Sequence, residues 1–407
     1  MKLFIYCIFF FFYLVHSQIK FDFSSINGNI IIHDISFGSP TNKYSLLLDS
    51  TTSDIWIAGA STKNLFQNTF TPMNFSTYKK HSTTMTFTYH SHVLTSYYVT
   101  DVVYDPSITM GFFIVSNSSK INEPITKDYS GVLGVKKIVN YNDDDSGSYS
   151  FLFISNLFKK NIIDYRSLMI EYKSDKKGEI TIGQNIMNIK DYYDRCISQI
   201  NKDDFERFKF FWYCNLKQIK EINDTIVYEN NTIFISSTDY ANYYFVFDTA
   251  SKYIEAPQKE LKFIFSLVIR LSNEKCFMRF MDSEHDMIVC NRDFDIRKVP
   301  DIKFKMNEKI LTIYSKDLFD FVDDHYVFKV IESNGEETWF MGEPLIKNYQ
   351  LILDYEKNFI YLGKTYSNLH NSNNSMTIIW IIIAISTIGL ISGVYWKIIL
   401  VRKKDIY

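Results

Sequence analysis

The feature that most restricts the fold of this chain is a pattern that occurs twice. In Leu46–Asp49 and again in Phe245–Asp248, three apolar residues lead into an aspartate, and a hydroxyl residue follows directly. Each copy is followed at a distance by two apolar residues and a glycine, at 132–134 and 340–342. One strand–Asp–turn segment is common in β proteins, but a paired set in the same order predicts two equivalent halves. Each half would end a buried strand with an acid.

Short runs rich in Ile, Val, Phe, Tyr and Thr dominate the body of the chain, and turn residues separate them. This pattern is typical of an all-β architecture. The runs predicted as strands are Asn29–Phe37, Tyr44–Leu48, Thr84–Tyr89, Leu94–Tyr104, Met110–Ser116, Gly178–Ile182, Thr232–Ser236, Tyr243–Asp248, Ile302–Lys305 and Tyr326–Ile331. Helical periodicity is rare, and only Tyr149–Phe158 and Ser315–Phe321 are predicted as helices.

The body is too long for one core of ordinary size and long enough for two. We therefore expect an N-terminal β lobe over residues 18–190 and a C-terminal β lobe over residues 191–366. The formal net charge of -2 argues against a nucleic acid or another polyanion as partner.

Both ends of the chain carry targeting signals. Residues 1–17 combine a basic start, a short apolar run and an acceptable cleavage site after Ser17, which predicts a signal peptide. Residues 376–396 carry no formal charge and are long enough to cross a bilayer as a helix. A polar stalk at 367–375 precedes this segment and a basic tail at 397–407 follows it. The positive-inside bias then predicts a single-pass type I protein with a lumenal or extracellular body.

Cysteine usage agrees with an oxidising compartment. Cys7 leaves with the predicted signal peptide, and an even number then remains for disulfides. Of the three possible pairings, we favour the one between nearest neighbours, Cys196–Cys214 and Cys276–Cys290. Glycosylation sequons add support at Asn74, Asn117, Asn223, Asn230 and Asn373.

Seven short motifs follow one another along the body: Gly38–Pro40, Asp49–Trp56, Phe87–Tyr89, Gly131–Gly134, Phe211–Trp212, Asp248–Ser251 and Trp339–Pro344. In order and spacing they resemble the motifs of the pepsin-like aspartic proteases over nearly the whole body. The resemblance implies a bilobal fold with pseudo-twofold symmetry. It also implies hydrolysis of peptide bonds by a water molecule held between two carboxylates, Asp49 and Asp248, of which one is ionised and the other protonated.

The resemblance implies roles for further residues as well. Ser50 and Thr249 are expected to cross-bond the two turns, and Thr52 and Ser251 to donate to the outer oxygens of the two acids. Tyr89 is expected to close over substrate with its phenol bonded to Trp56. Substrate contacts are expected from Tyr89, Val132, Ala250 and Thr51.

The chain departs from the family pattern at three places. Thr51 and Ala250 replace the motif glycines, and crowding of this kind costs ~1–3 kcal/mol, or roughly ten- to a hundredfold in rate. In the flap, residues 89–92 read Tyr-His-Ser-His and lack both usual glycines. We expect these histidines in an exposed loop, with acid sensing as the alternative. The predicted cleavage after Ser17 also leaves no room for the usual propeptide.

Two functions follow from these observations. The first is an active, membrane-anchored aspartic endopeptidase of the secretory pathway, residing in the endoplasmic reticulum, an endosome or the plasma membrane. The second is a catalytically inactive relative that keeps the cleft to bind a peptide or protein. In both cases we expect a monomer that needs no metal or other cofactor.

Overall fold

The computed structural model describes residues 18–39, 41–66, 68–71, 77–89, 92–103, 105–120, 125–137, 153–186, 194–196, 211–216, 226–237, 243–280, 286–306, 309–333 and 337–364. The predicted signal peptide, stalk, transmembrane segment and basic tail lie outside these residues. Among the helices in the described ranges, none is both long and apolar enough to cross a membrane.

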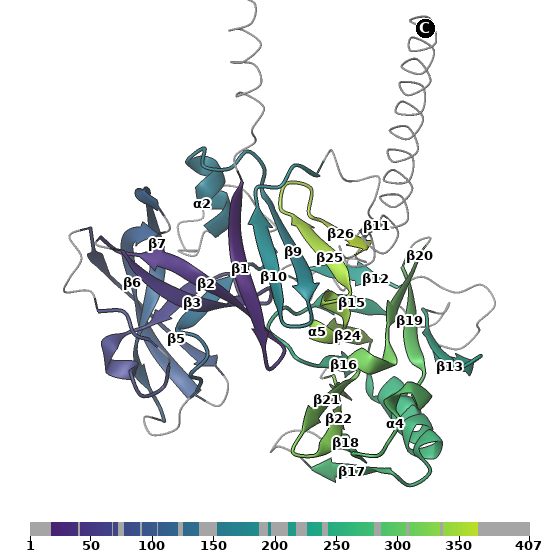
Figure 1. Ribbon diagram of the computed structural model, residues 1–407. Coiled ribbons are helices and arrows are strands. Elements are labelled where there is room, and N and C mark those ends of the chain that lie inside the picture. Colours follow the sequence, from purple (N-terminus) through teal and green to yellow (C-terminus); the bar gives the residue numbers. More distant parts are fainter. Residues whose placement is uncertain are drawn as a thin grey trace, which may run out of the picture.

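One large sheet forms the N-terminal part of the protein and continues toward the C-terminal part. Its strands, in spatial order, are β11 (Asp194–Cys196), β26 (Phe359–Lys364), β25 (Tyr349–Asp354), β9 (Ser167–Ser174), β10 (Lys177–Ile182), β1 (Ile19–Ile26), β2 (Asn29–Phe37), β3 (Asn42–Asp49), β8 (Gly131–Gly134), β4 (Ile55–Ala58), β7 (Asp105–Ser118), β6 (His92–Val103) and β5 (Lys79–Tyr89). Figure 1 shows β25 and β26, from the end of the described chain, beside β9 and β10 in the middle of the molecule. The sheet therefore joins segments from both predicted lobes.

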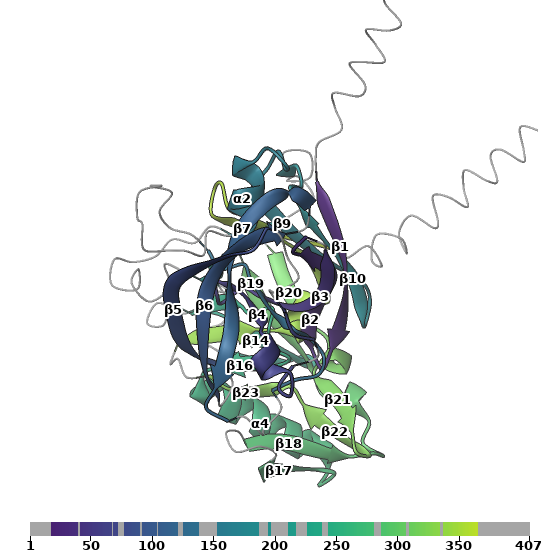
Figure 2. The same cartoon turned by 90° about the vertical axis from the view of Figure 1, so that its left-hand side faces the viewer.

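Three smaller sheets form the C-terminal part. The first orders β12 (Tyr213–Asn215), β15 (Tyr244–Phe247), β24 (Thr338–Met341), β16 (Ile254–Ala256) and β23 (Val330–Glu332); below it is called the central sheet. The second contains β13 (Ile226–Glu229), β14 (Thr232–Ile235), β19 (Asp301–Met306) and β20 (Lys309–Ile313). The third contains β17 (Cys276–Phe280), β18 (Asp286–Asn291), β22 (His325–Phe328) and β21 (Phe319–Val322). Figure 2 shows β5 and β6 as long, curved strands at the outer edge of the N-terminal part.

The described strands overlap all of the predicted runs, and β2 has the predicted bounds. The run Tyr326–Ile331 is divided into β22 and β23 at Lys329. Lys329 is buried, and its ammonium lies 2.7 Å from the Glu343 carboxylate. Lys329, which interrupts an apolar run, is therefore stabilised by Glu343. The local sequence pattern does not indicate this pairing.

The helix predictions were partly wrong. Helix α2 (Phe153–Lys159) overlaps the predicted segment Tyr149–Phe158 and ends one residue beyond it. The other predicted segment, Ser315–Phe321, forms a short 3-10 turn (Ser315–Asp317) and then enters β21. Pairing of β21 with β22 outweighs the local helical pattern there.

The longest described helix, α4 (Gln258–Ser272), was missed by the sequence prediction. It carried recognisable signals, because Leu261, Ile264, Phe265 and Val268 repeat at helical spacing and are buried. Pro257 precedes the helix, and Asn273 ends it in the left-handed conformation. A short third helix, α5 (Glu343–Ile346), follows β24.

The internal repeat predicted from sequence is present in the strand topology. In the N-terminal part β3 pairs in parallel with β8, β8 in antiparallel with β4, and β4 in parallel with β7. In the central sheet β15, β24, β16 and β23 repeat these three pairings in the same order. Gly134 and Gly342 take equivalent places, where a Cβ atom would lie 2.6 Å and 2.3 Å from backbone atoms of the neighbouring motif turn. Only glycine fits so close an approach.

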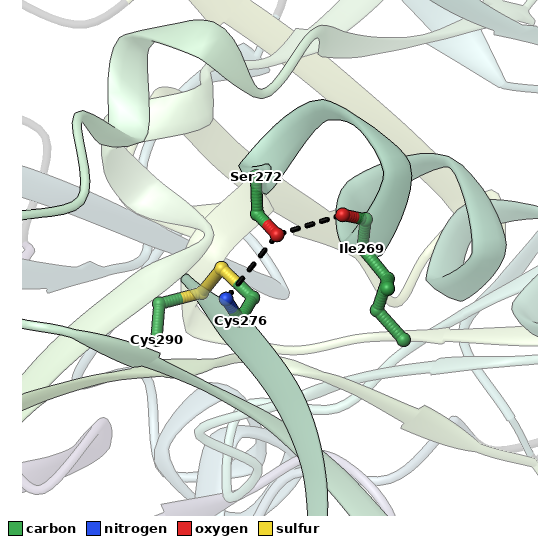
Figure 3. Close-up of a disulfide and its surroundings, with 4 residues drawn as sticks. All are labelled: Ile269, Ser272, Cys276 and Cys290. Carbon is green, nitrogen blue, oxygen red and sulfur yellow. Dashed lines mark hydrogen bonds between the residues drawn. A yellow bond between two sulfur atoms is a disulfide. The ribbon is translucent and has the colours of Figure 1, made fainter. Parts of the chain in front are cut away.

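The disulfide Cys276–Cys290 is confirmed, and it joins the paired strands β17 and β18. Figure 3 shows how the end of α4 is tied to it: the Ser272 hydroxyl donates to the Ile269 carbonyl and accepts from the Cys276 N–H. Cys214 is also disulfide-bonded. The side chain of Cys196 lies outside the described part, so the pairing Cys196–Cys214 stays a prediction.

Candidate active site

The two repeated aspartates lie at equivalent ends of strands. Asp49 is the last residue of β3, and Asp248 follows β15 directly. Hydrogen bonds from Val135 N–H to the Asp49 carbonyl and from Asp248 N–H to the Met341 carbonyl hold the two turns against neighbouring strands. Fixed strand ends thus determine where each acid side chain starts.

Ser50 and Thr249 connect the two turns. The Ser50 hydroxyl donates to the Phe247 carbonyl at 2.7 Å, and the Thr249 hydroxyl donates to the Leu48 carbonyl at 2.9 Å. Each hydroxyl also accepts the N–H of the other residue, at 2.9 Å for Ser50 N–H and 3.0 Å for Thr249 N–H. These four bonds across the two halves are the cross-link that the sequence predicts for these residues, and they bring the neighbouring acids together.

The donors to the acids differ from the prediction. Both the N–H and the hydroxyl of Thr51 donate to Asp49 Oδ1, at 2.7 Å and 2.6 Å. On the other side, the Ala250 N–H donates to Asp248 Oδ1 at 2.9 Å. The residues at the two glycine positions therefore supply these contacts.

The predicted hydroxyl donors, Thr52 and Ser251, bond elsewhere. The Ser251 hydroxyl donates to the Tyr253 carbonyl at 3.2 Å, and the Thr52 hydroxyl accepts the Asp54 N–H at 3.4 Å. Each closes a local turn with the backbone two residues ahead, which is a common alternative for Ser and Thr. Their predicted role as side-chain donors to the acids was wrong.

The environments of the two acids differ. Burial raises the pKa of Asp49, but the Thr51 hydroxyl and N–H oppose the rise. The Thr52 N–H and the charge of Lys136 oppose it further. Burial and the nearby charge of Asp49 raise the pKa of Asp248 to about 7, and the Ala250 N–H is the one hydrogen bond that lowers it. The pair is therefore arranged so that Asp248 holds the proton more readily than Asp49.

Tyr89 lies at the end of β5, as expected for a flap residue, but its hydroxyl has a different partner from the one predicted. It shares a hydrogen bond with the Tyr129 hydroxyl at 2.5 Å, while its ring meets the Trp56 ring edge to face with centroids 4.9 Å apart. Burial raises the pKa of Tyr129 to about 12 and raises that of Tyr89 well above its usual value, so both phenols stay protonated. Tyr129 belongs to a loop before β8 that no sequence pattern marked.

The predicted substrate contacts are not equally accessible. Thr51, Tyr89 and Ala250 are partly exposed, whereas Val132 has no exposed surface. Val132 packs in a small apolar cluster with Trp56 and Tyr129 beneath the flap. It cannot touch a substrate side chain in this conformation.

Of the flap histidines, His92 lies within the described residues. It is 3% exposed, and its Nδ1 lies 2.9 Å from the Ser118 hydroxyl. The expectation of an exposed loop was therefore wrong for His92, because pairing of β6 with β7 covers it. His90 lies outside the described part.

Two charged residues near the acids were not marked by the sequence. Lys136 follows β8, and its ammonium lies over the Phe211 ring at 5.1 Å from the centroid. Glu255 lies on β16, and its charge raises the pKa of Asp248. Within the described ranges, no cluster of three or more His, Cys, Asp or Glu side chains could hold a metal ion.

Comparison with protein families agrees with this geometry. Residues 31–365 match the family described as eukaryotic aspartyl protease, and the chain belongs to that family. No individual curated protein matches the chain.

Proposed function

We propose that the protein is an aspartic endopeptidase in which Asp49 and Asp248 activate a water molecule against a peptide bond. The observation that carries the proposal is the reciprocal bonding of Ser50 and Thr249, because it joins the two acid-bearing turns. The charge of Asp49 raises the pKa of Asp248, so the second carboxylate resists ionisation while the first is ionised.

The contacts of the acids support a separate role for each in this proposal. Asp49 is the ionised general base, because two hydrogen bonds from Thr51 and the positive charge of Lys136 oppose the rise in its pKa. Asp248, with its pKa raised to about 7, is the protonated general acid. Asp49 takes a proton from water while the water oxygen attacks the carbonyl carbon, and Asp248 gives its proton to the carbonyl oxygen. Asp49 then donates the proton that it took from water to the amide nitrogen, Asp248 takes back a proton from a hydroxyl of the tetrahedral intermediate, and the C–N bond breaks to give a carboxylic acid and an amine.

The side chains at the two glycine positions favour a second function, an inactive relative that binds a peptide between the lobes. Thr51 and Ala250 add atoms where the family has none, next to both acids. The alternative and the enzyme are distinguished by one comparison. Full-length protein in detergent is tested on a peptide library from about pH 4 to pH 7, beside its Asp248→Asn variant and with pepstatin as inhibitor.

An endopeptidase cleaves in a pepstatin-sensitive manner, and the Asp248→Asn variant loses at least about a thousandfold in rate. Equal and near-blank cleavage by both proteins would leave only the binding function. The Glu332→Gln variant changes an exposed acid on β23 and is the matched control, with unchanged cleavage expected.

We further propose that the protein enters the secretory pathway through residues 1–17 and is anchored by residues 376–396. A disulfide in the body agrees with an oxidising compartment. Deleting residues 376–407 is expected to move the protein from the carbonate-resistant membrane fraction to the soluble lumenal fraction. Retention in the membrane fraction would exclude the anchor.

Glycosylation is proposed for the two sequons in the described part. Asn117 and Asn230 are both exposed, the first on β7 and the second in the turn between β13 and β14. Asn74, Asn223 and Asn373 lie outside the described residues. Glycosidase treatment of the protein should lower its mass. In the Asn230→Gln variant this decrease in mass should be smaller by one glycan.

A further inference from the structure

Glu255 lies on β16, between β24 and β23 of the central sheet, on the face that also carries Asp248. It is directly opposite Phe340 on one side and Ile331 on the other. Side chains of directly opposed residues point to the same face of a sheet. Phe340 lies opposite Val246 on β15, and Val246 lies opposite Tyr213 on β12. The row therefore continues across the sheet to β15, the strand that leads into Asp248. We call this row of Tyr213, Val246, Phe340, Glu255 and Ile331 the acid face.

The opposite face of the same sheet is the ordinary core. Phe245, Trp339 and Ile254 point there and have no exposed surface. On the acid face, Phe340 and Glu255 are partly exposed, as is the nearby Asp248, whereas Tyr213, Val246 and Ile331 are buried. Asp248 and Glu255 are therefore both partly accessible on the same side of the sheet.

The Glu255 carboxylate has no partner among the residues that the structure describes. Burial alone raises its pKa to about 7, without an opposing hydrogen bond or positive charge. Other buried acids of the chain are paired: Glu343 with Lys329 at 2.7 Å, and Glu260 with the Tyr243 hydroxyl at 2.6 Å. Because an unpaired, largely buried carboxylate is costly, an acid of this kind beside a reactive pair indicates a binding role.

Comparison of the two repeats shows that Glu255 and Trp56 occupy equivalent positions. Glu255 stands seven residues after Asp248, as Trp56 stands seven residues after Asp49. Both residues oppose an antiparallel strand and a parallel strand in equivalent registers. In the first repeat this position holds an aromatic side chain that packs against the flap Tyr89, and in the second it holds an acid.

We propose that Glu255 binds a cationic side chain of the substrate, lysine or arginine, and so gives this site a preference for a basic residue near the scissile bond. The carboxylate supplies the ion pair, and the neighbouring, partly exposed Phe340 supplies apolar surface for the aliphatic stem of the basic residue. The proposal rests on the proposed function for its substrate class, but peptide binding tests it without catalysis.

The test uses full-length protein carrying Asp248→Asn, so that peptides bind without being cleaved. Labelled peptides of one sequence carry lysine, norleucine or glutamate at each position in turn, and affinities are measured at about pH 8, where Glu255 is ionised. At one position of the peptide, the lysine peptide is expected to bind about 10- to 100-fold more tightly than the norleucine peptide. Adding Glu255→Gln should remove this preference, and Glu255→Lys should turn it toward glutamate.

Glu332→Gln serves as the matched control and should leave the lysine preference unchanged, because Glu332 lies next to Ile331 but is exposed. Thermal unfolding checks that each variant is folded. A lysine preference that survives Glu255→Gln overturns the proposal, as does the absence of any lysine preference or of any peptide binding. Cleavage by the protein with Asp248 intact is measured separately. Charge preference without cleavage contradicts only the proposed enzyme activity, and cleavage without charge preference contradicts only the role of Glu255.

Discussion

The hydroxyl groups of Tyr89 and Tyr129 lie 2.5 Å apart and hold the tip of the flap hairpin against the loop before β8. Both phenols keep their protons because their pKa values are raised by burial, so the bond persists across the whole range in which carboxylates work. The position of Tyr89 therefore depends on a residue outside the hairpin.

Removing this bond should loosen the flap. Tyr129→Phe deletes one hydroxyl and is expected to cost about 1 kcal/mol, which corresponds to roughly fivefold faster amide exchange in the facing strand ends of β5 and β6. Hydrogen exchange read by mass spectrometry measures it. Tyr228→Phe removes a hydroxyl bonded only to exposed Asn231 in the C-terminal part, and it should leave flap exchange unchanged. Equal amide exchange of the flap in the Tyr129→Phe variant and the unaltered protein would show that the Tyr89–Tyr129 hydrogen bond does not hold the flap.

The cross-link between the two turns should be costly to remove. Ser50→Ala deletes a buried hydroxyl that donates to Phe247 and accepts from Thr249, so the free energy of unfolding should fall by about 2–3 kcal/mol. Chemical denaturation measures it. Ser130→Ala is the matched control, because the Ser130 hydroxyl is buried without a hydrogen-bond partner among the described residues. We expect that variant to be as stable as the original or slightly more stable. A similar loss in both variants would show that the cross-link adds nothing specific.

Thr51 should have two opposing effects. Its hydroxyl lowers the pKa of Asp49, so Thr51→Gly should raise that pKa and move the acid limb of kcat/KM up by about 0.5–1 pH unit. Loss of the Cβ should at the same time raise the plateau by up to roughly tenfold. Thr51→Ser keeps the hydroxyl and should keep the acid limb in place. An acid limb that does not move in Thr51→Gly would contradict the assignment of Asp49 as the base.

The raised pKa values predict how stability depends on pH. Asp248 and Glu255 each have a folded pKa of about 7, well above an unfolded value of about 4. Groups of this kind stabilise the folded state fully below about pH 4 and lose that contribution as the pH rises to about 7. The Asp248→Asn, Glu255→Gln double variant should therefore lose less stability over this interval, by several kcal/mol. Denaturation curves at a series of pH values test it, and parallel curves for both proteins would contradict it.

Much of the fold was readable from the sequence because β-strand runs and the repeated strand–Asp pattern are local. The ten predicted strand runs all overlap strands, and both repeats show the same three strand pairings. Local patterns failed where a tertiary contact decided. Ser315–Phe321 became a turn and an edge strand because β22 pairs with it, and α4 was missed although its apolar spacing was visible.

By itself, the sequence indicated the two acids, because the repeated strand–Asp pattern is local, and its resemblance to the pepsin-like aspartic proteases implied the hydroxyls that cross-link their turns. The tertiary structure alone decided which groups touch the acids and the flap. Thr51 rather than Thr52 donates its hydroxyl to Asp49, and Tyr129 rather than Trp56 bonds the flap phenol. It also left Glu255 unpaired beside Asp248. Such contacts join residues that are distant in sequence or differ by the rotation of one side chain, and no local pattern encodes them.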